Sequence, residues 1–247
     1  MENARLIGLS RQAALTRELA VIANNIANLN TSGFKVEGVS FQEFLSGGSN
    51  DSSSGSNRRL SFVVDGATWH DHRSGAIERT GNPLDVAIDG NAFLVVQGAD
   101  GERYTRSGAL QISANGELVD AAGKPVLGEG GPIVLQRQDR NINIARDGTV
   151  SVGDQTRGKL RLVEFAERER LTKEGANNFR APAGVTPQPS TTSALAQGAI
   201  EKSNVNSVLE MTRMIEVTRA YTHIAQLGQQ QSELRSKAVD RLAEVPA

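Results

Sequence analysis

Apolar residues near the N-terminus recur at helical spacing. Between about Asn3 and Asn30 they step by four, three, four and three, which is the narrow stripe of a coiled-coil-like seam. The stripe consists of Leu15, Leu19, Ile22, Ile26 and Leu29. Proline and glycine are absent from 9 to 32, and Gly33 stands where such a helix, or the turn after it, ends. The pattern predicts a long N-terminal helix.

A second helical pattern lies at the other end of the chain. From Asn204 to about Leu242 there is no proline and one glycine, and the apolar stripe advances by 3.5 residues per step on average. Its members are Val217, Tyr221, Ile224, Leu227, Gln231, Leu234 and Ala238. We therefore expect two terminal helices with narrow stripes, each of which must be buried against a partner.

The segment after the first helix changes character twice. Residues 34–45, FKVEGVSFQEFL, have an extended pattern. Residues 46–57, SGGSNDSSSGSN, have the composition of a flexible loop, so we interpret them as a mobile insertion and favour this over a binding loop.

The centre of the chain has a strand pattern. From about 60 to 185, short runs of Val, Ile, Leu and Phe alternate with turn pairs. The pairs are Asp89-Gly90, Asp100-Gly101, Asn115-Gly116 and Asp147-Gly148. Such pairs supply the positive φ angles of tight hairpin turns, which predicts antiparallel sheet in a sandwich or open barrel.

These patterns define the expected organisation. We expect an α+β protein in which a central all-β antiparallel domain is flanked by long helices that pair as a coiled-coil-like segment. The expected segments are a helix over 1–33, an extended segment and loop over 34–60, the β domain over 61–200 and the second helix over 201–247. The Pro-, Thr- and Ser-rich stretch 181–198 is interpreted as a connector that leads out of the sheet.

Composition narrows the function classes. The formal charge is -1, from 27 basic and 28 acidic residues, so no net field attracts nucleic acid or an anionic membrane. There is no cysteine, which excludes disulfides, thiolate metal sites and thiol catalysis. The N-terminus has no unbroken apolar run followed by a small-residue cleavage site, so we expect any export to proceed without a cleaved secretory signal.

Few residues offer catalytic or metal-binding chemistry. His70 and His72 are two apart, but the sequence shows no third ligand at zinc spacing, so we interpret them as a solvated pair near a turn. Asp85 and Asp89 flank a short strand and are interpreted as turn residues. Nucleophile and phosphate-loop motifs are absent, so we expect no enzyme activity, cofactor or small-molecule substrate.

Asn24, Asn25, Asn28 and Asn30 gather near the end of the first helix, where asparagine is only a middling helix former. One interpretation is a C-terminal capping region. The other is that their amides form hydrogen bonds across a packed helical interface and fix its register.

Four strings resemble the bacterial flagellar axial proteins, the rod and hook family. They are NNIANLNTSGFK at 24–35, LDVAIDGNAFLVV at 84–96, ERYTRSGALQISANGELV at 102–119 and SNVNSVLEMTRMIEVTRAY at 203–221. The opening MENARLIGLSRQ, the short length and the lack of a large inserted domain most resemble the proximal rod members. Ala92 stands where this family commonly has glycine, and the C-terminal end is more divergent.

The resemblance implies a structural subunit of the periplasm-spanning basal-body rod, exported by the flagellar type III apparatus and assembled with other rod subunits and copies of itself. It favours the interface interpretation of the asparagines. The expected assembly interface comprises Leu15, Leu19, Ile22, Asn24, Asn25, Ile26, Asn28, Leu29, Gly33, Phe34, Met214, Val217, Tyr221, Ile224, Leu227 and Leu234. We expect the termini to be largely disordered in the monomer and to order on polymerisation.

Three alternatives remain at this point. A distal rod or hook subunit would share the terminal helices but differ in length near residues 45–60. An exported carbohydrate-acting or metal-dependent hydrolase would need a convergent acid-base or metal site in the central β domain. A ligand-binding module would instead have ordered termini in the isolated monomer.

Overall fold

The computed structural model describes residues 2–46, 60–136, 139 and 141–243. The insertion predicted at 46–57 lies outside these residues except for Ser46. The chain forms two compact units. The first contains residues 1–26, 37–69 and 207–247, and the second contains residues 27–36 and 70–206. Each unit is therefore built from segments that are distant in sequence.

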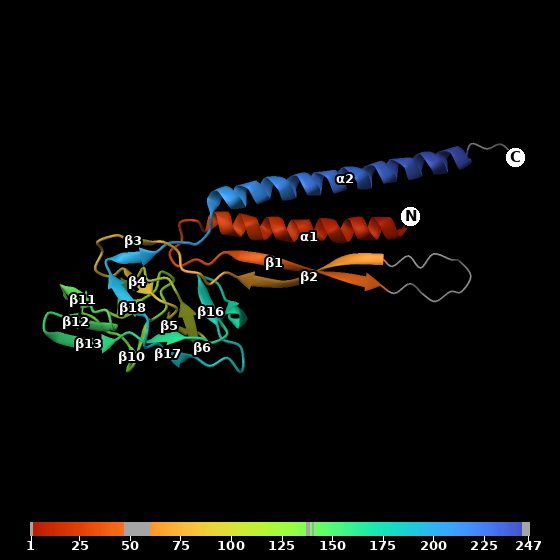
Figure 1. The fold of residues 1–247 in the computed structure, drawn as a ribbon. Coiled ribbons are helices and arrows are strands. Elements are labelled where there is room, and N and C mark those ends of the chain that lie inside the picture. Colours follow the sequence, from red (N-terminus) through yellow and green to blue (C-terminus); the bar gives the residue numbers. More distant parts are fainter. Residues whose placement is uncertain (1, 47–59, 137–138, 140, 244–247) are drawn as a thin grey trace. The chain divides into compact units, whose positions relative to one another are not determined.

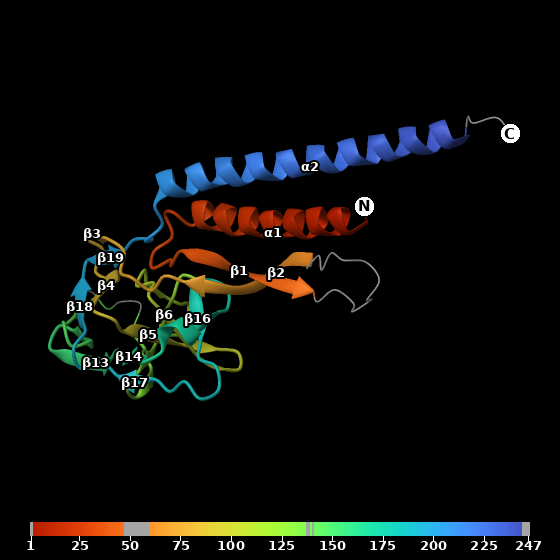
Figure 2. The ribbon, with the colours of Figure 1, turned by 45° about the vertical axis from the view of Figure 1, so that its right-hand side comes forward.

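The first unit consists of two helices and a strand pair. Helix α1 spans Glu2–Ala27 and helix α2 spans Ser207–Ala243, while strands β1 (Glu37–Ser46) and β2 (Leu60–His70) pair with each other. Figures 1 and 2 show α1 between α2 and the strand pair. Neither helix, over the residues placed in the structure, is long and apolar enough to cross a membrane.

Helix α1 ends three residues before the predicted Asn30. At its end the Thr31 amide donates to the Asn28 carbonyl at 3.2 Å, and the Thr31 hydroxyl donates to the Asn28 side chain at 3.0 Å. Short polar side chains compete with the helix for its backbone groups, which favours a turn here. The chain then reaches Gly33 at a φ of 68°.

The two helices differ in length, and their apolar stripes are unequally covered. At 1.5 Å per residue α1 is about 39 Å long and α2 about 56 Å. Ile22 of α1 and Val217 of α2 are buried, but Leu227 and Leu234 are 47% and 67% exposed. The first half of the α2 stripe is thus buried or half-buried within the chain, and the second half is exposed to solvent.

The second unit is an antiparallel β structure. Its largest sheet has six strands in the order β15-β16-β6-β5-β14-β17, and β11-β12-β13 form a three-stranded sheet. Four two-stranded pairs, β10-β9, β18-β4, β19-β3 and β7-β8, complete it.

The strands of this unit are β3 (Ile77–Arg79), β4 (Val86–Asp89), β5 (Phe93–Gly98), β6 (Gly101–Thr105), β7 (Gln111–Ile112), β8 (Leu118–Val119), β9 (Leu127–Gly128), β10 (Gly131–Pro132), β11 (Ile142–Ile144), β12 (Thr149–Val152), β13 (Gln155–Lys159), β14 (Leu162–Glu164), β15 (Thr172–Lys173), β16 (Asn178–Arg180), β17 (Gln188–Pro189), β18 (Ala194–Gln197) and β19 (Ala199–Glu201), with a short 3-10 helix at Arg168–Arg170.

Strand β5 carries the core of this unit on both of its faces. Leu94 and Val96 belong to an aliphatic cluster, whereas Phe93 and Val95 belong to a cluster rich in aromatic rings. Successive side chains of a strand point to opposite faces, so an unbroken apolar run such as FLVV marks a strand covered on both sides. The antiparallel central domain is as the sequence predicted.

Three of the four turn pairs make the predicted hairpins. Asp100-Gly101 joins β5 to β6, Asn115-Gly116 joins β7 to β8, and Asp147-Gly148 joins β11 to β12, each pair of strands being antiparallel. Asp89-Gly90 differs, because β4 pairs with β18 and not with β5. Gly90 still has a positive φ of 124°, so the dipeptide fixes a turn without specifying which strand pairs next.

The stretch 181–198 is more than the predicted connector. It contains β17 and β18, and β18 pairs with β4 over four residues, from Ala194↔Asp89 to Gln197↔Val86. The prediction was wrong because the prolines punctuate only its first half. The proline-free remainder satisfies its backbone groups, and those of β4, by pairing in the sheet.

The packing of β5 gives a first prediction. Replacing Leu94, which is fully buried, with alanine should lower the free energy of unfolding of the second unit by about 2 to 5 kcal/mol, because the cavity adds to the lost apolar burial. Chemical denaturation followed by circular dichroism measures this. Val134→Ala is the matched control, since Val134 is 54% exposed, and should change stability by less than about 0.5 kcal/mol.

Candidate functional site

The turn that follows α1 is held in the second unit by backbone contacts. The amide of Gly33 donates to the carbonyl of Glu201 at 2.7 Å, and the Ser32 hydroxyl donates to the same oxygen at 3.2 Å. A β-carbon added to Gly33 would lie 2.5 Å from the carbonyl carbon of Arg106. Glycine is therefore required here by both its φ and its close backbone neighbour.

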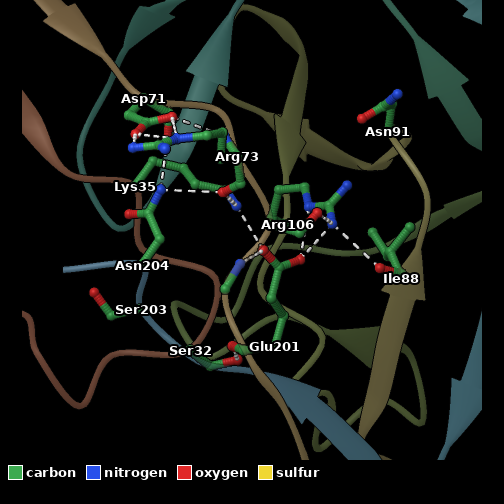
Figure 3. Close-up of polar contacts among 12 residues, drawn as sticks. Ser32, Lys35, Asp71, Arg73, Ile88, Asn91, Arg106, Glu201, Ser203 and Asn204 are labelled. Carbon is green, nitrogen blue, oxygen red and sulfur yellow. Dashed lines mark hydrogen bonds and ion pairs between the residues drawn. The ribbon is translucent and has the colours of Figure 1, made fainter. Parts of the chain in front are cut away.

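Beside this turn, two cations converge on one buried carboxylate. Lys35 Nζ lies 2.5 Å from Glu201 Oε1, with both side chains fully buried. Arg106 is 2% exposed and donates from Nε to Glu201 Oε2 at 2.8 Å, with a second, short contact from Nη2. Figure 3 shows both cations directed at this carboxylate. We call Lys35, Arg106 and Glu201 the Glu201 cluster.

The Glu201 cluster is satisfied by the surrounding backbone. Arg106 Nη1 donates to the carbonyls of Gly90 at 2.7 Å and Ala92 at 2.8 Å, and Nη2 donates to that of Ile88 at 3.1 Å. The second carboxylate oxygen of Glu201, Oε1, also accepts the Gly75 amide at 3.0 Å. The guanidinium thus anchors the end of β4 while it pairs with Glu201, as its planar fork of five donors allows.

Asn204 fastens the neighbouring segments around the Glu201 cluster. Its Oδ1 accepts the Val36 amide at 2.8 Å, and its Nδ2 donates to the carbonyls of Asp71 at 2.8 Å and Arg73 at 3.0 Å. Lys35 Nζ also donates to the Arg73 carbonyl, at 2.7 Å. One amide side chain therefore bridges the segment after α1, the segment after β2 and the segment before α2.

These contacts lie where the chain enters and leaves the second unit. It crosses between the units at 26/27, 36/37, 69/70 and 206/207, which makes four crossings. Segments 27–36, 70–76 and 201–204 each contribute partners to the contacts described above. The second unit thus gathers the ends of all its connections around Glu201.

Electrostatics make the Glu201 cluster sensitive to the loss of Glu201 or Arg106. Burial lowers the pKa of Lys35, against the opposing attraction of Glu201, and the nearby Arg106 lowers it further. Two cations face one carboxylate, and carbonyl oxygens accept the remaining donors. Breaking a buried ion pair typically costs about 3 to 5 kcal/mol, because it leaves a desolvated charge without a partner.

Asn25 has a comparable role inside the first unit. Its Oδ1 accepts the Glu37 amide at 2.9 Å and its Nδ2 donates to the Glu37 carbonyl at 2.8 Å, so the side chain pairs with β1 as another strand would. Nδ2 also donates to Glu210 Oε2 at 3.0 Å. Asn25 and Glu210 are 1% and 2% exposed, so this contact joins α1, β1 and α2 in a buried site.

Three protein-family models match three separate parts of the chain. Residues 6–35 match the flagella basal body rod protein model, and residues 87–152 match the D1 domain of the flagellar hook proteins FlgE, FlgF and FlgG. Residues 196–241 match the C-terminal region of the flagellar basal body rod FlgEFG proteins.

Individual relatives match the chain over nearly its whole length. The flagellar basal-body rod protein FlgF of Caulobacter vibrioides is 39% identical over 99% of this chain and 100% of its own. FlgF of Mesorhizobium japonicum is 38% identical over 98% of each chain. The chain belongs to the flagellar basal-body rod protein family. FlgG of Bacillus subtilis, at 34% identity, matches 87% of this chain and 89% of its own.

The Glu201 cluster draws one member from each of the three family matches. Lys35 is the last residue of the first match, Arg106 lies in the second and Glu201 in the third. Lys35 and Glu201 are 166 positions apart, and Arg106 and Glu201 are 95 apart. In this rod-family chain, residues that the sequence separates widely meet at one buried carboxylate.

The histidine pair is half-buried and packs against aromatic rings, whereas the sequence-based expectation was a solvated pair near a turn. The His72 ring lies 5.3 Å from the ring of Phe179 and 6.0 Å from that of Phe93, and 6.3 Å from His70. Both ring nitrogens of His72 are buried without a hydrogen-bond partner among the described residues. The chain passes directly from β2 over the aromatic cluster, so the rings pack as part of it. In the described part of the chain, no three His, Asp or Glu residues are arranged to hold a metal ion.

The predicted interface residues fall into three groups by burial. Ile22, Asn25, Gly33, Phe34 and Val217 are buried within the chain. The half-buried ones are Leu15, Leu19, Ile26, Asn28, Leu29, Met214, Tyr221 and Ile224, and the exposed ones are Asn24, Leu227 and Leu234. The exposed and half-buried side chains keep part of their surface accessible to solvent in the single chain.

Sequence reasoning missed the Glu201 cluster and a second exposed stripe. Val208, Met211 and Ile215 of α2 recur at helical spacing and are 73%, 51% and 53% exposed. A pattern search on α2 could have found this stripe. No local signal pointed to Lys35 or Glu201, because each is an ordinary charged residue until the fold buries it.

The burial of His72 gives a pH prediction. Burial and repulsion from His70 lower the pKa of His72 from 6.5 to about 4, so it stays neutral in the folded state where the unfolded chain binds a proton. Stability should therefore be unaffected above pH 6.5, fall by roughly 1 to 2 kcal/mol as the pH drops toward 4, and level off below.

The His72→Phe variant should lack this part of the pH dependence when denaturation midpoints are measured from pH 7 to pH 4 (about the range set by the two pKa values). The His223→Phe variant serves as the control, because His223 is exposed on α2. Identical pH profiles for wild type and His72→Phe would contradict the assignment.

Asn25 supports a prediction on the first unit. Asn25→Asp replaces the donor Nδ2 with an oxygen that faces the Glu37 carbonyl and Glu210, so the first unit should lose about 2 to 3 kcal/mol. Hydrogen exchange of the Glu37 amide measures the effect. Asn30→Asp, at an exposed position shortly after the same helix, is the control, and equal effects of the two changes would refute the role of Asn25.

Proposed function

We propose that this chain is a structural subunit of the flagellar basal-body rod that polymerises through its terminal helices and transmits torque to the hook. The observation that supports this most is the end-to-end similarity to rod proteins, which includes both helices and the β unit. The structure supports polymerisation physically, because the apolar side chains of both long helices are only partly buried.

The position we propose is the proximal rod. The FlgF relatives from Caulobacter and Mesorhizobium align over 98% or more of both chains, whereas FlgG relatives align over 81% to 87% of this chain. Coverage of nearly the full length of both chains favours the FlgF-type subunit. The distal rod remains the second candidate, because FlgG relatives reach 36% identity.

Assembly would bury the open parts of the helices against neighbouring subunits. Leu6, Leu9, Leu227 and Leu234 are 52%, 63%, 47% and 67% exposed. Near the start of α1 the two helices border an open cavity of about 820 Å³, lined by Leu6, Ile7, Leu9, Ile224 and Leu227 among others. Fully burying one such side chain contributes about 1.5 to 3 kcal/mol, so several repeated at every contact suffice to hold a polymer.

The remaining parts of the proposal follow from this role. The partners are other rod subunits and copies of this chain, and the interface comprises the seam residues of both helices. The chain reaches the periplasm through the flagellar export apparatus without a cleaved signal. The contribution is mechanical and not enzymatic, and helices with open stripes gain order when neighbours cover them.

Incorporation into basal bodies tests the proposal. Leu234→Glu should lower the amount of this protein in purified hook-basal bodies by at least about tenfold and abolish swimming, because it places a charge in the seam. Quantitative mass spectrometry against the other rod proteins measures this. Glutamate has a helix propensity close to that of leucine, so the helix itself is retained.

Ser232→Glu is the matched control. It adds the same charge two residues away on α2, which places it about 200° around the helix from Leu234. The control should leave incorporation unchanged. Absence of the wild-type protein from basal bodies that contain the other rod proteins would reject the rod function altogether.

A further inference from the structure

We propose that Lys35 is the closing member of a latch within the second unit. Arg106 and Glu201 form an ion pair that is part of the β structure and persists without Lys35. Lys35 binds segment 27–36 to this ion pair. The segment can therefore dock and undock while the β structure remains folded. The mechanical significance of this latch rests on the proposed function, but its existence does not.

The first argument is the asymmetry between the two cations. The side-chain hydrogen bonds of Arg106 lead to Glu201 and to residues 74–92, among them the carbonyls of Ile88, Gly90 and Ala92. Arg106 and Glu201 together carry no net charge. They form a balanced, hydrogen-bonded pair that needs no contribution from the segment after α1.

The second argument is that Lys35 is the cation in excess. It adds a positive charge to a pair that is already neutral, and it is fully desolvated when it does so. It donates to Glu201 Oε1 and to the Arg73 carbonyl. Glu201 Oε1 keeps the Gly75 amide as a donor when Lys35 is withdrawn. Undocking therefore leaves neither Glu201 oxygen without a partner.

The third argument is that the segment docks through one continuous set of contacts with the rest of the second unit. Ser32 and Gly33 donate to the Glu201 carbonyl, and the Val36 amide donates to the Asn204 side chain. The carbonyls of Ser32, Phe34 and Val36 accept from Asn177, Asn204 and Asp71. Phe34 is 1% exposed and packs beneath Lys173, whose Nζ lies 3.9 Å from the ring centroid. Lys35 adds its buried ion pair to this set, so docking is expected to be cooperative.

The latch has a consequence for the proposed rod subunit. Segment 27–36 begins at the last residue of α1, the helix proposed to assemble with neighbours. A closed latch holds segment 27–36 on the β structure through a charged, fully buried contact. An open latch releases this segment from the β structure.

Hydrogen exchange on the full-length protein, read by mass spectrometry, tests the latch. In Lys35→Glu a carboxylate would face Glu201, so peptides covering 27–36 should exchange at least about 100-fold faster, while peptides of β5 and β6 keep their wild-type protection. Arg106→Met should accelerate exchange in both regions, because it removes the anchor of β4 and leaves buried donors and acceptors unpaired.

Lys202→Glu is the matched control for Lys35→Glu, and Gly81→Ala is the matched control for a further variant, Gly33→Ala. Lys202→Glu makes the same charge reversal at the exposed neighbour of Glu201 and should leave 27–36 protected. Gly33→Ala should open the latch without altering charge, whereas Gly81→Ala, at a similar positive φ but with open space around it, should not.

Two results would overturn the latch. Unchanged exchange over 27–36 in Lys35→Glu would show that Lys35 does not hold the segment. Equal acceleration in β5 and β6 would show that Lys35 is an inseparable part of the β core. Both readouts come from the isolated protein, so they stand apart from the basal-body experiment, and failure of one proposal is distinguishable from failure of the other.

Discussion

A carboxylate buried in a protein interior needs cations and hydrogen-bond donors around it, and in this chain that requirement shapes the second unit. Glu201 is fully buried, and Lys35, Arg106 and the Gly75 amide supply its donors. These residues come from segments that the chain order keeps far apart. Their meeting fixes where the turn after α1, the exit from β2 and the approach to α2 must lie.

In the first unit, a buried neutral side chain has the same need for hydrogen-bond partners. Asn25 uses both its donor and its acceptor on the backbone of Glu37, and it also binds Glu210. Each unit therefore relies on one buried polar site that joins discontinuous segments. Apolar packing supplies most of the stability, whereas these polar sites specify which segments meet, because an unmatched partner would leave a buried group unsatisfied.

A rod subunit needs one region that is stably folded and another region that binds neighbouring subunits. The β unit meets the first demand through β5, which is covered by core side chains on both faces. The helices meet the second, because Leu227, Leu234 and the stripe of Val208, Met211 and Ile215 are exposed in the single chain. Helical periodicity alone identifies apolar faces, but only the packed chain shows which parts of those faces it leaves uncovered.

The sequence by itself determined the two helices, the antiparallel centre, three hairpins and the family, because periodicity, turn chemistry and motif strings are local properties. It did not determine that 181–198 returns to pair with β4, that His72 packs on aromatic rings, or that Lys35 and Arg106 meet Glu201. Those outcomes were decided by tertiary structure, because burial, desolvation and partner choice depend on residues tens to hundreds of positions away.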